Sequence, residues 1–138
     1  MNFLIHHGGT ETRRKLIHEG LTDQIIGAAI EVHRELGPGL LESAYEECLC
    51  HELHLRNLPF QRQVPLPVAY KGVALDCGYR IDIMVADSVV VELKCLEHIL
   101  AVHEAQLLTY LKMTKKRVGL ILNFHVATMA RGIVRKVI

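Results

Sequence analysis

The chain of 138 residues has no tryptophan, no long uncharged hydrophobic run and almost no net charge. Because no stretch of about 18 consecutive uncharged apolar residues occurs, the sequence predicts no membrane-spanning helix. The net charge of +1 gives no overall attraction to nucleic acid, so any such binding must depend on local basic patches. The first residues, MNFLIHHGGTETRRK, have the wrong charge order and too short an apolar core for a signal peptide, and we expect a cytoplasmic protein.

Cysteine occurs four times, at positions 48, 50, 77 and 95, and no two form a C-x-x-C pair. Cys77 and Cys95 fall within predicted strands, so we expect buried thiols and not disulfides or a metal cluster. The nine histidines show no H-x-x-x-H or HExxH pattern, which disfavours a zinc or redox protein. Only His33 and His103 come near the candidate site described below, and we interpret both as structural or solvent-facing.

The length fits a single domain, in which we expect residues 1–20 to be weakly ordered and residues 21–138 to be folded. Thr22 or Asp23 is a candidate cap for the first helix, and Pro65 and Pro67 favour a position near a sheet edge. Hydrophobic periodicity predicts helices over residues 22–36, 41–56 and 102–113, and strands over residues 60–70, 73–85, 89–95, 118–124 and 133–138. This order indicates an α/β fold with a mixed central sheet flanked by helices.

Residues 78–94, GYRIDIMVADSVVVELK, combine acidic residues and a lysine with two apolar strands. Alternation predicts that Glu92 and Lys94 emerge on one side of their strand, and that Ile81, Ile83 and Val85 share one side of the preceding strand. If the strands pair across a turn at residues 86–88, Asp82 lies beside Glu92 and Lys94. Converging carboxylates repel each other unless a cation joins them, and oxygen ligands suit Mg²⁺ or Mn²⁺. The alternative is a surface salt bridge between Lys94 and an acid.

Other polar residues have two interpretations each. Glu42 is either a site residue or an acid favoured by the first turn of a helix, and Tyr45 is expected to pack with a tethered hydroxyl. Gln106 and Tyr110 are four residues apart and therefore share a helix face. Arg80 is expected to contact a phosphate or to form a structural ion pair. A basic run offers either phosphate contacts or a solvated helix end, and it comprises Lys112, Lys115, Lys116 and Arg117.

Taken together, these positions resemble the PD-(D/E)XK nuclease superfamily, and within it the proteins named for a GxxExxY motif, here at residues 39–45. Supporting stretches are IIGAAIEVHRELGPGLLESAYE, QVPLPVAYKG, LDCGYRIDIMV, VVELK, HEAQLLTYLK and VGLILNF. The resemblance implies a restriction-endonuclease-like core. It also implies that Asp82 and Glu92 bind the metal with the Leu93 carbonyl and, directly or through water, with Glu42. Lys94 would act on the attacking water. Gln106 and Tyr110 would hold a phosphate and the strand that carries Glu92 and Lys94, which we call the motif strand.

The resemblance predicts a Mg²⁺-dependent nuclease (with Mn²⁺ as a substitute) that hydrolyses phosphodiester bonds, most readily those of DNA. The rival class is a non-catalytic module that keeps the fold and binds nucleic acid or a partner protein. Retention of the polar motif positions favours the enzyme. Because so small a domain has little surface for specificity, a homodimer or a partner protein is an expected source of further contacts.

Overall fold

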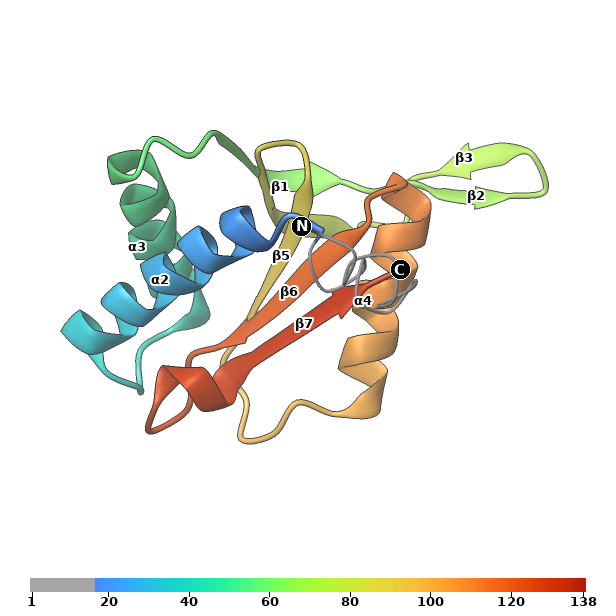
Figure 1. Cartoon of the computed structure of the whole chain (residues 1–138). Helices are drawn as coiled ribbons and strands as arrows, with labels where there is room; N and C mark the ends of the chain where they lie inside the picture. Colours follow the sequence, from blue (N-terminus) through green and yellow to red (C-terminus); the bar gives the residue numbers. More distant parts are fainter. Residues whose placement is uncertain (1–16) are drawn as a thin grey trace, which may run out of the picture.

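A five-stranded sheet with helices on both faces forms the body of the protein (Figure 1). The computed structural model describes residues 17–138, and the expectation for residues 1–16 lies outside this range. The strand order is β1-β4-β5-β6-β7, and a separate two-stranded sheet pairs β2 with β3. The elements are α2 (Glu19–Leu36), α3 (Glu42–Leu55), β1 (Phe60–Pro65), β2 (Val68–Tyr70), β3 (Val73–Leu75), β4 (Arg80–Val85), β5 (Val89–Lys94), α4 (Ala101–Thr114), β6 (Val118–Asn123), a short 3-10 helix (Met129–Gly132) and β7 (Ile133–Val137).

The mixed character of the sheet follows from its connections. Strands β4 and β5 are antiparallel and joined by a tight turn, in which Ala86 and Asp87 both have positive φ angles. Strands β5 and β6 are parallel, because α4 connects them across one face of the sheet. Strand β1 lies at one edge, as its prolines predict, and β7 lies at the other. The predicted α/β fold is therefore confirmed.

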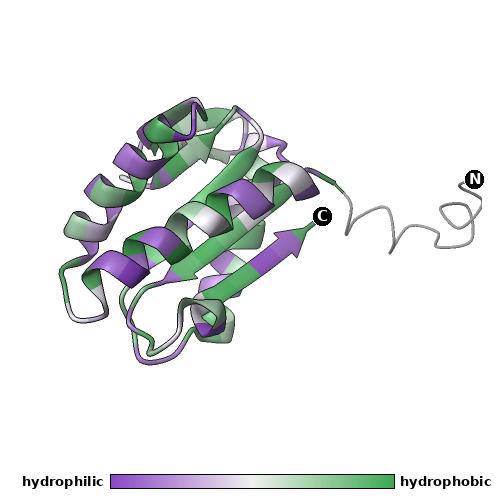
Figure 2. Ribbon diagram, turned by 60° about the vertical axis from the view of Figure 1, so that its left-hand side comes forward, coloured by the Kyte–Doolittle hydropathy of each residue, from purple (hydrophilic) through white to green (hydrophobic). Residues whose placement is uncertain are grey.

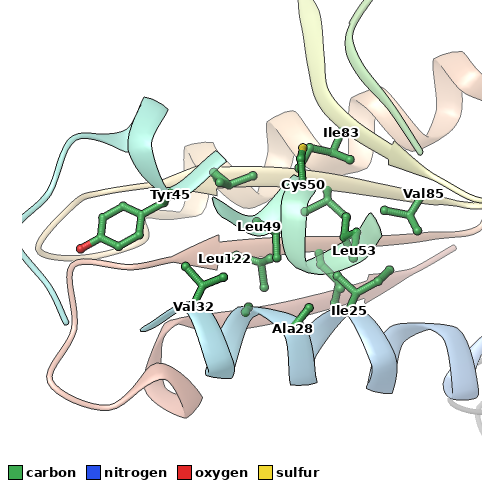
Figure 3. Packing of buried hydrophobic residues seen from close by; sticks show 14 of the residues in the cluster. Ile25, Ala28, Val32, Tyr45, Leu49, Cys50, Leu53, Ile83, Val85 and Leu122 are labelled. Atoms are coloured by element: carbon green, nitrogen blue, oxygen red, sulfur yellow. The ribbon is translucent and has the colours of Figure 1, made fainter. Parts of the chain in front are cut away.

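The larger part of the core lies between the sheet and helices α2 and α3. Figure 3 shows Ile25, Ala28 and Val32 of α2 and Leu49 and Leu53 of α3 directed at the sheet. Tyr45 is fully buried against Phe124, with ring centroids 4.5 Å apart and an interplanar angle of 11°. Its hydroxyl donates to the carbonyl of Gly37, so the expected packing role with a tethered hydroxyl is confirmed.

A smaller hydrophobic cluster joins the opposite face of the sheet to α4. Leu107 and Leu111 of α4 pack there with Met84, Val90 and Ile121. Gly119 of β6 allows the helix to approach closely, because a Cβ atom at this position would lie 2.7 Å from the side chain of Leu107. The strands are mostly hydrophobic (green), whereas the helices carry both hydrophobic and hydrophilic (purple) turns (Figure 2). Within residues 17–138, no helix is long and apolar enough to span a bilayer.

Four local expectations are wrong. The predicted strands over residues 60–70 and 73–85 are each divided, and β2 and β3 form a separate hairpin that projects beyond α4 (Figure 1). Helix α2 begins at Glu19, so neither Thr22 nor Asp23 caps it, and residues 19–20 are helical. Cys77 is exposed in the β3–β4 loop and Cys95 is half-buried just after β5, so neither lies in a strand. All four thiols are free, but only Cys50 is buried, so the expected burial is wrong for Cys48, Cys77 and Cys95.

The fourth correction concerns the faces of β4. Ile83 and Val85 face α2 and α3, but Ile81 packs with Met84 in the cluster under α4. The cause lies in the neighbouring strand, where Gln63 has a φ of 50° and is missing from the pairing register. This irregularity breaks the alternation of both strands at the level of Asp82.

Candidate active site

Strands β4 and β5 part at the position of Asp82 and Glu92. Their register runs only from Val85↔Val89 to Ile83↔Val91. Beyond Ile83↔Val91, hydrogen bonds from the backbone to the two carboxylates replace the backbone–backbone hydrogen bonds between the strands. The backbone N–H of Asp82 donates to Oε2 of Glu92 at 2.9 Å, and the backbone N–H of Leu93 donates to Oδ2 of Asp82, also at 2.9 Å. The predicted proximity of Asp82 and Glu92 is confirmed, and their hydrogen bonds hold both side chains in place.

The cost of bringing these acids together appears in their pKa values. Burial, followed by the nearby charge of Asp82, raises the pKa of Glu92 from 4.5 to about 8. Glu92 is only 5% exposed. Burial also raises the pKa of Asp82, although the hydrogen bond from Leu93 opposes this effect. The site therefore favours either a bound proton or a bound cation.

Lys94 lies two residues beyond Glu92, half-buried at the end of β5. Its positive charge lowers the pKa values of Glu42, Asp82 and Glu92, which places it near all three acids. Yet within residues 17–138, no carboxylate lies within 4.0 Å of its ammonium group. The salt-bridge alternative is therefore not realised in the part of the chain that the structure describes. The ammonium group remains available to another partner.

Glu42 begins α3 and faces the same region. More than a third of its surface is exposed, but partial burial and the charge of Asp82 raise its pKa. The start of α3 has no side-chain cap, because the apolar Leu41 occupies the capping position. The structure thus brings Glu42 near Asp82 and Lys94 and also places it in the first turn of α3, so it is compatible with both interpretations.

A buried acid that the sequence reasoning missed lies one helical turn after Glu42. Glu46 is 7% exposed and accepts two hydrogen bonds from Arg62, at 3.1 and 2.9 Å. It also accepts a 2.9 Å hydrogen bond from the side-chain amide of Gln63. The same amide nitrogen donates to Oδ1 of Asp82 at 3.5 Å. The spacing of four residues from Glu42 was the available signal. Its partners on β1 could not be found without the fold.

Helix α4 contributes the second side of the site. Nε2 of Gln106 donates to the hydroxyl of Tyr110 at 3.0 Å, so the predicted sharing of a helix face is confirmed. Burial and then the charge of Glu92 raise the pKa of Tyr110, which places this tyrosine near the motif strand. Tyr79, which the sequence reasoning also missed, meets Tyr110 edge to face, with centroids 6.2 Å apart.

The chain after Lys94 is held by Asn123, a third residue that the sequence reasoning missed. Asn123 is 2% exposed at the end of β6 and pairs with Lys94 in the register. Its side chain accepts from the backbone N–H of Leu96 at 3.0 Å and donates to the carbonyl of the same residue at 2.8 Å. In the sequence, the available signal was an asparagine at the end of a strongly apolar strand. The fold places this strand end beside Lys94.

The structure separates the remaining candidates from this group. Lys116 forms an ion pair with Asp87 in the β4–β5 turn. This turn precedes the first residue of β5, which is five residues, or about 16 Å along the strand, from Lys94. Arg117 donates to the carbonyl of Ile138, while Lys112 and Lys115 are exposed. Arg80 is exposed near the site and has no ion pair among residues 17–138.

Both histidines have structural roles. Nε2 of His33 lies 2.8 Å from the carbonyl of Val126, and the residue is 8% exposed. Nδ1 of His103 accepts a hydrogen bond from the backbone N–H of Leu100 at the start of α4. The expectation that His33 and His103 are structural is therefore confirmed.

The donor atoms of the site fit a hard divalent cation. Asp82 and Glu92 present carboxylate oxygens whose raised pKa values show that a positive charge would stabilise both ionised forms. Within the described chain, no three His, Cys, Asp or Glu side chains form a metal site by themselves. Two carboxylates nevertheless suffice for Mg²⁺, which usually keeps several waters.

Comparison with known proteins agrees with this geometry. A family model described as the PD-(D/E)XK nuclease superfamily matches residues 19–136, and the chain belongs to this superfamily. Its members are generally nucleases and typically depend on a divalent metal. No curated protein and no solved structure matches the chain significantly.

Proposed function

We propose that the protein is a Mg²⁺-dependent nuclease that hydrolyses phosphodiester bonds of DNA, and that it belongs to the GxxExxY group of the superfamily. The observation that carries this proposal is the opening between β4 and β5. There, Asp82 and Glu92 exchange hydrogen bonds with the facing backbone, and Lys94 lies beside them without an ion-pair partner within the described chain. Purely structural acids and lysines of a sheet would neutralise each other by direct contact.

Each residue has a distinct part in this reaction. Asp82 and Glu92, with the backbone carbonyl of Leu93, would hold the cation, and Glu42 would assist directly or through a water molecule. The cation, Mg²⁺ or Mn²⁺, supplies Lewis-acid activation of water and neutralises charge on the phosphate. Lys94 orients the attacking water and stabilises the negative charge of the transition state. The hydrogen bond with Tyr110 orients Gln106 toward the motif strand and a substrate phosphate.

Substrate contacts outside the centre are proposed for four cations. Arg80 is exposed at the start of β4 and can reach a phosphate near Asp82. Lys112, Lys115 and Lys116 lie at the other end of β5 and would contact a more distant part of the strand. A homodimer or a partner protein would extend this small contact surface.

The proposal is tested by incubating circular and linear DNA, and matching RNA, with the pure protein and either Mg²⁺ or Mn²⁺. Wild type should cut DNA, and Lys94→Ala should lose at least about 100-fold in rate, as expected for a group that stabilises transition-state charge. Lys136→Ala is the matched control, because Lys136 lies on the edge strand β7 in an ion pair with Glu104. If wild type binds the nucleic acids but cuts none of them, the protein is a non-catalytic binding module.

A further inference from the structure

A groove beside the candidate active site has no role in the chemistry described so far. It has a volume of about 550 Å³ and lies along one side of α4. Its walls are Val68 and Tyr79 on one side, and Val102, Ala105, Thr109 and Met113 of α4 on the other. The volume is within the range of small-molecule sites, and the lining is mainly apolar, as in such sites.

The groove adjoins the residues proposed for catalysis. Gln106 and Tyr110 lie in its wall, and Tyr110 is close enough to Glu92 for the charge of that carboxylate to add to the effect of burial in raising the pKa of the tyrosine. The ring of Tyr79 is 46% exposed and meets Tyr110 at an angle of 69°. An occupant of the groove would therefore contact an exposed aromatic surface and an amide while lying next to the carboxylates.

Two cations neighbour the groove-lining residues along the chain. Arg80 follows Tyr79 directly, and Lys112 precedes Met113, and both cations are exposed without an ion pair in the described part of the chain. The acid on this stretch of α4, Glu104, is neutralised by Lys136 at 2.6 Å. An apolar, aromatic groove with cations beside it matches the two parts of a nucleotide, the base and the phosphate.

We infer that this groove receives an unpaired base of the DNA strand, stacked on Tyr79, while the adjacent phosphate lies beside Lys94, at the cation that Asp82 and Glu92 would hold. This inference rests on the proposed nuclease function and makes it more specific. A base that remains paired within a duplex cannot enter a groove between side chains without leaving its stack. Because flipping a base out of a duplex costs unstacking energy, a single strand or a frayed end is the preferred substrate.

The inference is tested by measuring DNA binding in EDTA, where no cleavage occurs. The probes are a fluorescent single-stranded oligonucleotide and a strand of equal length and charge that carries abasic sites. Wild type should bind the intact strand about tenfold more tightly, because stacking of one base on an aromatic ring has an effect of this order. Tyr79→Phe should keep the preference, whereas Tyr79→Ala should abolish it. Ala105→Leu, which fills the groove from an exposed helix position, should also abolish it.

Tyr70→Ala is the matched control, since Tyr70 is a 60% exposed tyrosine of the neighbouring β2–β3 hairpin that does not line the groove. Equal binding of intact and abasic strands by wild type would overturn the inference, and so would a loss of preference in Tyr70→Ala alone. A changed oligomeric mass of Tyr79→Ala in light scattering would also overturn it, because the groove would then bind a second protein chain. A base preference without cleavage in Mg²⁺ would instead reject only the nuclease activity.

Discussion

The β4–β5 hairpin has two halves that lie along the same pair of strands, one apolar and the other acidic. Near the turn, Ile83, Met84 and Val85 pair regularly with Val91, Val90 and Val89, and all six side chains are buried. We call this part the closed half. In the open half, Asp82 and Glu92 occupy the place of the backbone ladder, and Lys94 follows.

The difference shows where the hairpin gains stability and where it stores an unfavourable interaction. The closed half removes apolar surface from water on both faces of the sheet, which stabilises the fold. The open half keeps two acids in a site that raises their pKa values. Such a site is costly for the empty protein, and binding of a cation would offset that cost.

The largest expected effect on stability lies in the closed half. Ile83→Ala should lower the free energy of unfolding by about 2–5 kcal/mol, because it leaves a cavity at a fully buried position. Asp82→Asn, one residue away, should leave it within about 1 kcal/mol, because the amide oxygen can still accept the bond from Leu93. Urea denaturation in EDTA measures both. Equal losses would mean that the two halves do not differ in this way.

A pH-dependent effect should distinguish Glu92 from the residues near the turn. Because its pKa is raised to about 8 in the folded protein, Glu92 contributes stability below pH 4.5 that is lost as the pH rises through about 8. Glu92→Gln should therefore melt near the wild-type temperature at pH 5 and several degrees higher at pH 9, without metal. Thermal scans across this range measure the difference. A difference that does not change with pH would contradict the burial of an ionisable Glu92.

Helix α4 extends the open half, and its effect should appear in turnover. Gln106→Ala should lower kcat about tenfold or more with a smaller change in DNA affinity, because a misplaced group mainly affects the transition state. Thr114→Ala at the end of the same helix is the control, since its hydroxyl bonds only to the carbonyls of Tyr110 and Leu111 and it does not line the groove. Single-turnover cleavage and equilibrium binding separate the two quantities. If DNA affinity fell and kcat did not, Gln106 would bind DNA without a part in orienting the transition state.

The smallest expected effect concerns the basic residues next to the closed half. Replacing Lys112, Lys115 and Lys116 with alanine should weaken DNA binding a few-fold at low salt and leave kcat unchanged. On a single strand, the slope of log affinity against log salt should fall by about 0.7 for each phosphate that a lysine no longer neutralises. Lys116 contributes least, because it is paired with Asp87. An unchanged slope would show that DNA does not reach this end of the hairpin.

Local patterns were sufficient to predict most of the framework. The element order, the β4–β5 turn and the sharing of a face by Glu92 and Lys94 follow from periodicity, which depends on neighbouring residues. The pairing of Gln106 with Tyr110 follows from helical spacing in the same way. These features were correct because no distant contact changes them.

Features that depend on distant contacts were missed. The inward turn of Ile81 depends on the left-handed Gln63 in another strand, and the burial of Glu46 depends on Arg62. At the start of α2, Arg135 of β7 contacts Thr22 and the carbonyl of Ile17, more than 110 residues away. The groove beside α4 likewise depends on distant contacts, because it brings Val68 of the β2–β3 hairpin and Tyr79 of the following loop against α4.

The central claim is that the open half of the hairpin binds a divalent cation, and two aspartates of this hairpin allow a direct test. Asp82 lies in the open half, and Asp87 lies in the turn of the closed half with its side chain 87% exposed. Isothermal calorimetry should show that Mn²⁺ binds equally to wild type and Asp87→Asn, and at least about tenfold more weakly to Asp82→Asn, because a charged oxygen ligand is lost. Equal binding of Mn²⁺ to wild type and Asp82→Asn would contradict the account.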